Sequence, residues 1–369
     1  MKTSPQLNPH LLQVPLYTPG RSVEEVMSEL GLETVTKMAS NESPVGSSTL
    51  ALTAAHEMLG KAHRYPGQLD QRLRQKLARR LGHSLTEHNI VLANGGTNAL
   101  HMLTQAFVFD GGNSVMSRVT FPLYNIFTLT FGGQSRQVKP TPTYEHDLQS
   151  MLAHIDDDTR LIYLCSPNNP SGHIISQMAA DDFLAQVPSH VVVIFDEAYF
   201  DYVTDSEYPD TLEYVTAARN VLILRTFSKS AGLANMRIGY LIGPRQLTDY
   251  VRRAQLPFHV NEISLAAAYA SLDDESYHKK HRQTVLDGRD FLYTQLSALG
   301  LSCLSSQANF VTIVDPPLPV PELVDSLLRR GVIVRGMGGF GLPNGVRVSV
   351  GSTAANQKFI EAMKAILGD

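Results

Sequence analysis

The stretch TFSKSAGLANMRIGY, residues 226–240, contains the side chains with the clearest potential for chemistry. It places Lys229 directly after Ser228 and puts Arg237 further along, between two apolar runs. A serine–lysine pair taken alone is more often part of an ordinary solvated loop. Lys229 becomes a candidate nucleophile only if other groups converge on it, because an amine must be neutral to react and its surroundings decide this.

Three other apolar runs also end in polar residues. NIVLA leads into NGGTNALHML, where Gly96 and Thr97 open a helix whose free N–H groups suit a phosphate. RLIYLC leads into SPNNPSG, which displays Asn169, and HVVVIF leads into DEAYF, which leaves Asp196 at the strand end. In open α/β sheets, ligands bind beyond the carboxyl ends of the strands, so these groups should share one edge with Lys229.

This combination of groups matches the needs of one cofactor, pyridoxal 5'-phosphate. Its aldehyde requires a lysine, its pyridine nitrogen an acid and its phosphate a set of donors, which Lys229, Asp196 and the glycine turn can supply. Ser228 and Arg237 can also reach the phosphate, the arginine through a fixed charge-assisted contact. The sequence therefore predicts a pyridoxal-phosphate site.

The runs that end in these residues also predict the fold. Between about residues 86 and 245, uninterrupted apolar runs alternate with helical stretches, which is typical of parallel strands covered by helices on both faces. We therefore expect an α/β fold, a three-layer sandwich with a mostly parallel central sheet, plus a smaller α+β C-terminal domain. The strand candidates are NIVLA, RLIYLC, HVVVIF, NVLILRT and RIGYLIG.

The predicted domain organisation has three parts. Residues 1–40 are expected to form an N-terminal arm and helix that pack with the small domain. Residues 41–256 would be the large cofactor-binding domain, and residues 257–369 the small C-terminal domain.

The composition restricts the class of partner. A chain of 369 residues with 43% hydrophobic and 18% charged residues is typical of globular proteins, and its net charge of −4 argues against nucleic acid. Two cysteines, Cys165 and Cys303, offer neither a disulfide scaffold nor metal-ligand spacing. We see no signal sequence and no apolar run of membrane-spanning length. We therefore expect no nucleic-acid, membrane or metal partner, and a cytoplasmic location.

The motifs SPNNPSG, DEAYF and TFSKSAGLANMRIGY, in this order and spacing, resemble those of the fold-type I pyridoxal-phosphate-dependent aminotransferases. Within this class the chain resembles the histidinol-phosphate aminotransferase family over nearly its whole length. The narrower resemblance rests on YTPGRSVEEV (17–26), ASNESPVG (39–46), HRYPG (63–67), VTFPLY (119–124), PFHVN (257–261) and NGVRVSVG (344–351).

The resemblance implies roles at the cofactor ring. Lys229 would hold the cofactor covalently and then shuttle the proton between the substrate's α-carbon and the cofactor's aldehyde carbon. Asp196 would pair with the pyridine nitrogen, and Asn169 and Tyr199 would contact the phenolic oxygen. Phe121 would stack on the ring, where relatives often have tyrosine.

The resemblance also implies the ligands of the phosphate and of the substrate. Tyr65 would reach the phosphate from the neighbouring subunit, which implies a homodimer. The phosphate ligands within the subunit would be Gly96, Thr97, Ser228 and Arg237. Arg347 would bind the substrate's carboxylate or phosphate, with Tyr17, Asn41 and Arg335 near the same pocket.

Two arginines bear on the substrate. Valines alternate with Arg347 in VRVSV, so Arg347 must lie on the strand face opposite to the valines. Arg335 ends the neighbouring strand candidate GVIVR, so both guanidinium groups should reach one pocket and suit a phosphate dianion or the two carboxylates of glutamate. We therefore expect amino transfer between L-histidinol phosphate and 2-oxoglutarate, giving imidazole acetol phosphate and L-glutamate in histidine biosynthesis.

Other functions remain open. The chain reads Gly96-Thr97-Asn98-Ala99 where the family commonly reads G-S-D-E, which spares the phosphate contacts but puts the substrate in question. An aromatic amino acid is the second candidate for the amino donor, and a pyridoxal-phosphate lyase or decarboxylase would use the same cofactor residues. A regulator that senses the cofactor would normally carry a DNA-binding helix-turn-helix, for which the short N-terminal arm leaves no room.

Two further motifs are set aside. GMGGFG at 336–341 fits a dinucleotide fingerprint, but it leads into a strand instead of the helix that would hold a pyrophosphate. HKKH places His278 and His281 one helical turn apart, and without further ligands we interpret them as a solvated helix face.

Overall fold

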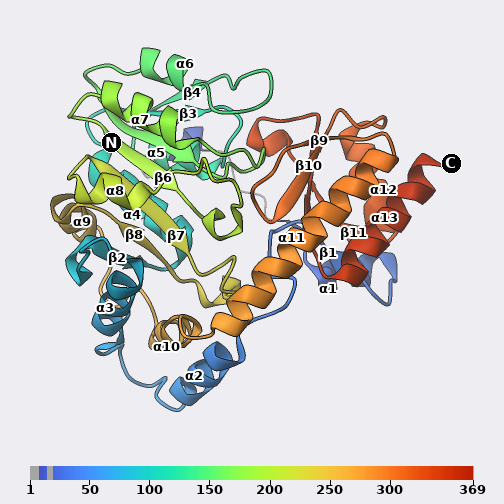
Figure 1. Ribbon diagram of the computed structural model, residues 1–369, viewed down its shortest axis with the longest axis horizontal. Coiled ribbons are helices and arrows are strands. Elements are labelled where there is room, and N and C mark those ends of the chain that lie inside the picture. Colours follow the sequence, from blue (N-terminus) through green and yellow to red (C-terminus); the bar gives the residue numbers. More distant parts are fainter. Residues whose placement is uncertain (1–7, 15–19, 369) are drawn as a thin grey trace, which may run out of the picture.

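The long helix α11 (Glu275–Ala298) runs beside two regions that each contain a β-sheet (Figure 1). The computed structural model describes residues 8–14 and 20–368 of the chain. The larger region holds a seven-stranded sheet and the smaller region a four-stranded one. None of the helices in the described ranges is long and apolar enough to cross a membrane.

The seven-stranded sheet is mostly parallel, as the sequence predicts, with the strand order β2-β8-β7-β6-β5-β3-β4. RIGYLIG was expected to be one of its parallel strands, but β8 is antiparallel to both β2 and β7. The loop from Thr226 to Gly239 contains only a short 3-10 turn, so it cannot make the helical crossover that a parallel pair needs. The strands are β2 (Ile90–Ala93), β3 (Asn113–Ser117), β4 (Gln134–Val138), β5 (Thr159–Cys165), β6 (Val192–Asp196), β7 (Val221–Thr226) and β8 (Gly239–Ile242).

Helices cover both faces of this sheet, because successive residues of a strand point to opposite faces. In β6, Val193 and Phe195 belong to one buried apolar cluster, whereas Val192 and Ile194 belong to another. The three resulting layers confirm the predicted fold class. The first cluster is covered by α2 (Thr49–Leu59), α3 (Leu69–Leu81), α6 (Leu148–Ala153), α7 (Gln177–Gln186), α8 (Thr211–Thr216) and α10 (Glu262–Ser271), and the second by α4 (Gly95–Phe107), α5 (Leu123–Thr130) and α9 (Arg245–Arg252).

The smaller region is an antiparallel sheet with the strand order β12-β13-β10-β9. Val346 and Val348 of β13 pack in one buried cluster with Phe359 and Met363 of the last helix. The elements of this region are β9 (Ser302–Leu304), β10 (Phe310–Val314), α12 (Val320–Arg329), β12 (Arg335–Gly336), β13 (Gly345–Ser349) and α13 (Thr353–Leu367).

The N-terminal segment joins the smaller region. Helix α1 (Val23–Leu30) begins with a capping box between Ser22 and Glu25. Strand β1 (Thr36–Lys37) then pairs in parallel with β11 (Val332–Ile333). The predicted division into an arm, a large domain and a small domain stays a prediction. Helix α10, which lies within the residues assigned to the small domain, packs against α2 and α3 of the larger region.

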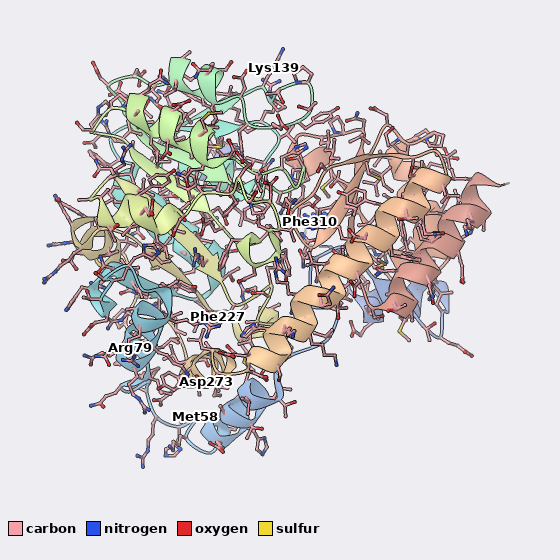
Figure 2. All side chains as sticks on the ribbon, in the orientation of Figure 1. Met58, Arg79, Lys139, Phe227, Asp273 and Phe310 are labelled. Carbon is pink, nitrogen blue, oxygen red and sulfur yellow. The ribbon has the colours of Figure 1, made fainter. Side chains whose placement is uncertain are left out.

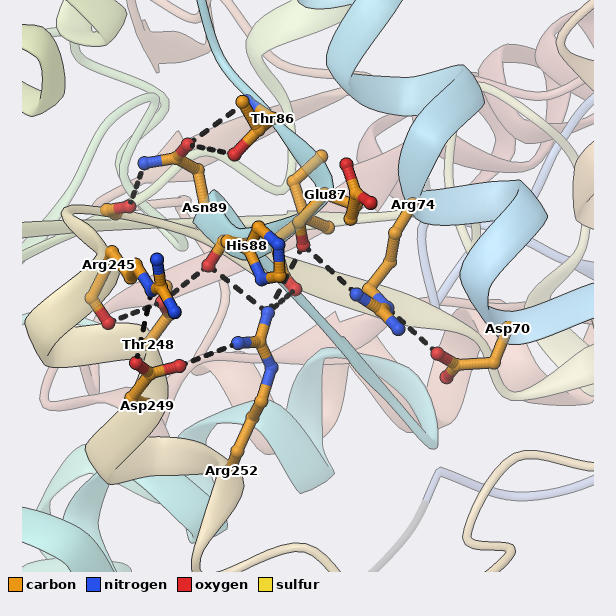
Figure 3. Close-up of polar contacts among 12 residues, drawn as sticks. Asp70, Arg74, Thr86, Glu87, His88, Asn89, Arg245, Thr248, Asp249 and Arg252 are labelled. Atoms are coloured by element: carbon orange, nitrogen blue, oxygen red, sulfur yellow. Dashed lines mark hydrogen bonds and ion pairs between the residues drawn. The ribbon is translucent and has the colours of Figure 1, made fainter.

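Side chains close the free edge of β2, the outer strand of the large sheet (Figure 3). Arg252 of α9 donates from Nη2 to the carbonyl oxygens of Glu87, His88 and Ile90, at distances of 3.1, 3.1 and 2.7 Å. Glu87 and His88 lie in the 3-10 turn that precedes β2, and Ile90 is the first residue of the strand, so Arg252 covers the start of this edge.

Phe310 lies between the two regions (Figure 2). Its ring, on β10 of the small sheet, packs edge-on against Tyr199, which follows β6 of the large sheet, with 5.3 Å between the ring centroids. The contact fixes Tyr199 against the smaller region, at the place where the two sheets approach each other.

Candidate active site

A cavity of about 300 Å³ lies beyond the carboxyl ends of β5, β6 and β7. Its walls come from both regions and from residues 39–42 of the N-terminal segment. The structure therefore brings together most of the residues predicted from the sequence. The predicted residues that line the cavity are Asn41, Gly96, Thr97, Phe121, Asn169, Asp196, Tyr199, Ser228, Lys229, Arg237, Arg335 and Arg347.

Lys229 lies in the loop after β7 and lines the cavity. Its Nζ donates to the carbonyl oxygen of Ser40 at 3.0 Å and lies 5.7 Å from the ring centroid of Tyr199. Burial, followed by the Arg347 guanidinium group, lowers the pKa of the Lys229 amine to about 8. A substantial fraction of the amine is therefore neutral near physiological pH, as attack on an aldehyde requires.

Asp196 ends β6 and is only 4% exposed. The hydroxyl of Tyr124 donates to its Oδ2 at 2.7 Å, and the Ala198 N–H donates to its Oδ1 at 3.1 Å. Burial raises the pKa of the Asp196 carboxyl to about 6, although both hydrogen bonds act to lower it. A buried carboxylate of this kind gains stability from a protonated ring nitrogen placed beside it.

A hydrogen-bonded chain connects the two sheets across the cavity. The Tyr199 hydroxyl accepts from Nδ2 of Asn169 at 3.3 Å and from Nδ2 of Asn41 at 3.0 Å. Arg347 donates to Oδ1 of Asn169 at 2.5 Å and to the carbonyl oxygen of Ala39 at 2.7 Å. Because Arg347 is only 4% exposed, these contacts hold its guanidinium group in a fixed orientation.

One end of the cavity suits an anion. Gly96 and Thr97 lie in the first turn of α4, where backbone N–H groups have no partner within the helix. Arg237 and Ser228 line the same cavity. A Cβ atom on Gly95, whose φ is +83°, would lie 2.5 Å from Nη2 of Arg237, so glycine is needed for the guanidinium group to approach the helix this closely.

Two further arginines line the cavity. Arg335 and Arg347 are direct register partners across β12 and β13, and both line the cavity. The apolar wall beside them includes Phe121 and Phe340, whose ring centroids are 6.4 Å apart.

Among the predicted residues that the structure describes, Tyr65 does not line this cavity. Tyr65 is 79% exposed and stacks on Phe258 with 4.6 Å between the ring centroids. Tyr17 lies outside the described residues. Within the described ranges no cluster of three histidine, cysteine or acidic side chains could hold a metal ion.

Sequence reasoning missed several residues of the site. Tyr124 lies inside the VTFPLY motif, but only the fold shows its contact with Asp196. Phe340 belongs to GMGGFG, which leads into β13 as expected and contributes a cavity wall. The interpretation of HKKH as a solvated face is wrong for His281, which is 1% exposed because aromatic side chains cover this part of α11.

Comparisons with known proteins identify the family of this chain. Residues 33–363 match the family described as aminotransferase class I and II. The chain is 40% identical over 366 residues to the histidinol-phosphate aminotransferase of Moorella thermoacetica, with 99% of this chain and 94% of the relative covered. It is 36% identical over 362 residues to that of Bacillus subtilis, with 98% and 100% covered.

A solved structure is similar over the full length. The histidinol-phosphate aminotransferase from Sinorhizobium meliloti, in complex with pyridoxal-5'-phosphate, superposes with a TM-score of 0.89 at 25% identity. The superposition covers 100% of this chain and 99% of that one.

The fold and the cavity are those of a fold-type I pyridoxal-phosphate enzyme. The buried amine fits the cofactor's aldehyde, the buried carboxylate fits its ring nitrogen, and the anion cradle formed by Gly96, Thr97, Ser228 and Arg237 fits its phosphate. The chain belongs to the class I and II aminotransferase family and, within it, to the histidinol-phosphate aminotransferases. It is a pyridoxal-phosphate-dependent aminotransferase, which confirms the predicted enzyme class and cofactor.

Proposed function

We propose that this enzyme transfers the amino group of L-histidinol phosphate to 2-oxoglutarate, in histidine biosynthesis. The observation that carries the proposal is the pairing of Arg335 with Arg347 in a cavity that also contains Lys229. Two guanidinium groups on paired strands suit a phosphate dianion, and they also suit the two carboxylates of 2-oxoglutarate in the second half-reaction. The names of the similar relatives support the same substrate.

The cavity residues have complementary roles in this proposal. Bound pyridoxal phosphate supplies an electron sink for the pair left on the α-carbon when that carbon loses its proton. The Lys229 amine, with a pKa of about 8, takes and returns this proton. Asp196 keeps a proton on the ring nitrogen, and Asn169 and Tyr199 donate to the phenolic oxygen. Phe121 packs on the face of the ring.

The anion cradle holds the cofactor's phosphate. Gly96 and Thr97 offer backbone N–H groups, and Ser228 and Arg237 offer side-chain donors. Asn41 has a supporting role on the substrate side, because its side chain donates to Tyr199 and accepts from Ser349 at 2.7 Å. Tyr17 remains a predicted substrate ligand.

We also propose a homodimer in which Tyr65 crosses to the neighbouring site. Tyr65 is largely exposed, and the nearby Phe258 and Leu256 are 58% and 72% exposed. Apolar side chains grouped in this way are typical of a surface that another protein covers. The cytoplasmic location expected from the sequence stays a prediction.

An aromatic amino acid is the second candidate for the amino donor. The flat rings of Phe121 and Phe340 form an apolar wall of the cavity, which would accept a phenyl ring as well as an imidazole.

A half-reaction screen tests the proposal. The purified enzyme, with its cofactor but without a 2-oxo acid, is mixed with each candidate amine, and the absorbance of the lysine-bound cofactor is followed. Histidinol phosphate should convert the cofactor fastest. Faster conversion by phenylalanine or tyrosine would show that the amino donor is an aromatic amino acid instead of histidinol phosphate. Release of carbon dioxide from an amino acid would indicate a decarboxylase.

A further inference from the structure

We infer that Tyr124 is a positioning residue, whose hydroxyl keeps Asp196 ionised and oriented toward the ring nitrogen of the cofactor. The inference rests on the proposed role of Asp196. The Tyr124 hydroxyl lies 2.7 Å from Oδ2 of Asp196, and both side chains are buried, at 0% and 4% exposure. No sequence motif predicts this contact, because α5 and β6 are brought together only by the fold.

The direction of this hydrogen bond is fixed by chemistry. A phenol can donate to a carboxylate, and a carboxylate can only accept. Burial and the negative charge of Asp196 hold the pKa of the Tyr124 phenol well above its usual range. The hydroxyl therefore stays protonated, and remains a donor, at neutral pH.

The surrounding packing holds the donor in place. The ring of Tyr124 stacks on that of Tyr163, with 4.6 Å between centroids and 9° between planes. The Tyr163 hydroxyl is itself paired with Thr104 at 2.7 Å. On its other side Tyr124 meets Phe121 edge-on at 5.8 Å, so one side chain supports both the carboxylate and the apolar wall of the cavity.

The hydroxyl matters because burial works against an ionised Asp196. The groups that act on this carboxylate are Tyr124 from α5, Cys165 from β5, its neighbours Glu197 and Tyr199, and Lys229 from the loop after β7. Among the interactions that lower the pKa of Asp196 and so favour its charged form, the hydrogen bond from Tyr124 has the largest effect. Without its hydroxyl, a buried carboxylate would keep only the Ala198 N–H among the protein donors that lower its pKa by hydrogen bonding.

The first test uses the cofactor-free protein and the variant Tyr124→Phe. Infrared titration of the carboxyl band, assigned by its loss in Asp196→Asn, gives the pKa of Asp196 directly. We expect this pKa to rise by about 1 or more, a tenfold change in proton affinity, because a hydrogen bond to a charged group is lost. The matched control is Tyr163→Phe, which removes the neighbouring buried hydroxyl without touching Asp196, and should leave the titration unchanged.

The second test uses the enzyme with its cofactor. Tyr124→Phe should weaken cofactor binding by about tenfold and lower kcat with little change in KM for the amino donor. An unchanged titration and cofactor affinity in Tyr124→Phe would overturn the inference, as would equal effects in Tyr163→Phe. If Asp196→Asn binds the cofactor and turns over like wild type, the proposed role of Asp196 itself fails.

A second variant keeps the inference testable if Tyr124→Phe does not fold. Replacement of Tyr124 by 3-fluorotyrosine retains the shape and makes the phenol a stronger donor. The pKa of Asp196 should then fall below the wild-type value. A titration that does not move in this protein would also contradict the inference.

Discussion

At Lys229, burial and neighbouring positive charge act together on one amine. Both favour the neutral form, and they lower the pKa to about 8. The Ser40 carbonyl oxygen orients the same amine at 3.0 Å. The residue is therefore both nucleophilic and positioned before any ligand enters.

Replacing Lys229 with alanine should remove both turnover and the covalent link to the cofactor. We expect borohydride treatment to leave no reduced cofactor attached to Lys229→Ala, whereas the surface variant Lys280→Ala should label like wild type. Mass spectrometry of the reduced protein provides the measurement. Reduced cofactor found on another lysine would show that the assignment is wrong.

The strand-end residues of the site could be predicted from sequence, because the carboxyl ends of parallel strands meet at one edge of the sheet. A polar residue that directly follows a buried strand must therefore lie at that edge. Asn169, Asp196 and Lys229 all line the predicted edge. Tyr124 could not be predicted in its role, since two strands (β4 and β5) and two helices (α6 and α7) separate it from its partner in the sequence.

At the scale of elements, the apolar runs predicted five strands of the large sheet but not β3 or β4. β3 reads NSVMS, and three of its five residues are polar yet buried; Nδ2 of Asn113, for example, donates to Asp156 at 2.8 Å. β4 lies at the sheet edge and exposes polar side chains. Neither strand has the continuous apolar pattern on which the prediction depended.

Helix α11 contains a histidine whose burial affects stability. The ring nitrogens of His281 lie 3.2 Å from the hydroxyls of Tyr202 and Tyr277. Burial lowers the pKa of His281 from its ordinary value of 6.5 to about 4. The unfolded chain therefore binds a proton more readily than the native protein between these values, and stability is lost as the pH falls through this window.

We expect His281 to cost the wild-type protein about 2 kcal/mol of unfolding free energy at pH 5 relative to pH 7.5. Urea unfolding at both pH values measures this difference. The variant His281→Gln should lose that part of the pH dependence, and His278→Gln, on the same helix, should retain it. Equal pH dependence in wild type and His281→Gln would contradict the assignment.

The strand pair β12 and β13 determines the predicted substrate preference. Removing the charge in Arg335→Gln should lower kcat/KM for histidinol phosphate by about tenfold to a hundredfold, the cost of a charge-assisted hydrogen bond. Phenylalanine has no distal anion, so its kcat/KM should change much less. The control is Arg329→Gln, which breaks only an exposed ion pair with Asp325. Equal losses for both substrates would show that Arg335 does not bind the distal anion.

At the scale of the whole molecule, the site depends on segments that are distant in sequence. Residues 39–42 come from the N-terminal segment, Lys229 from the loop after β7 of the large sheet and Arg347 from the small sheet. The sequence indicated each segment, but not that Asn41 would hydrogen-bond both Tyr199 and Ser349, because that network exists only after long-range packing.

The predicted dimer places Tyr65 in a second molecule's site. Tyr65→Phe should weaken cofactor retention on dialysis, since a hydroxyl ligand of the phosphate is lost, while Tyr250→Phe, at another exposed position, should not. Sedimentation at assay concentration should show a dimer. A fully active monomer would contradict this arrangement.

The most direct measurement of the central claim is a comparison of wild-type kcat/KM values for the amino donors, with 2-oxoglutarate as acceptor. The two paired arginines beside Lys229 predict that histidinol phosphate is used with the highest kcat/KM. A higher kcat/KM for phenylalanine or tyrosine would contradict the account and make the enzyme an aromatic aminotransferase.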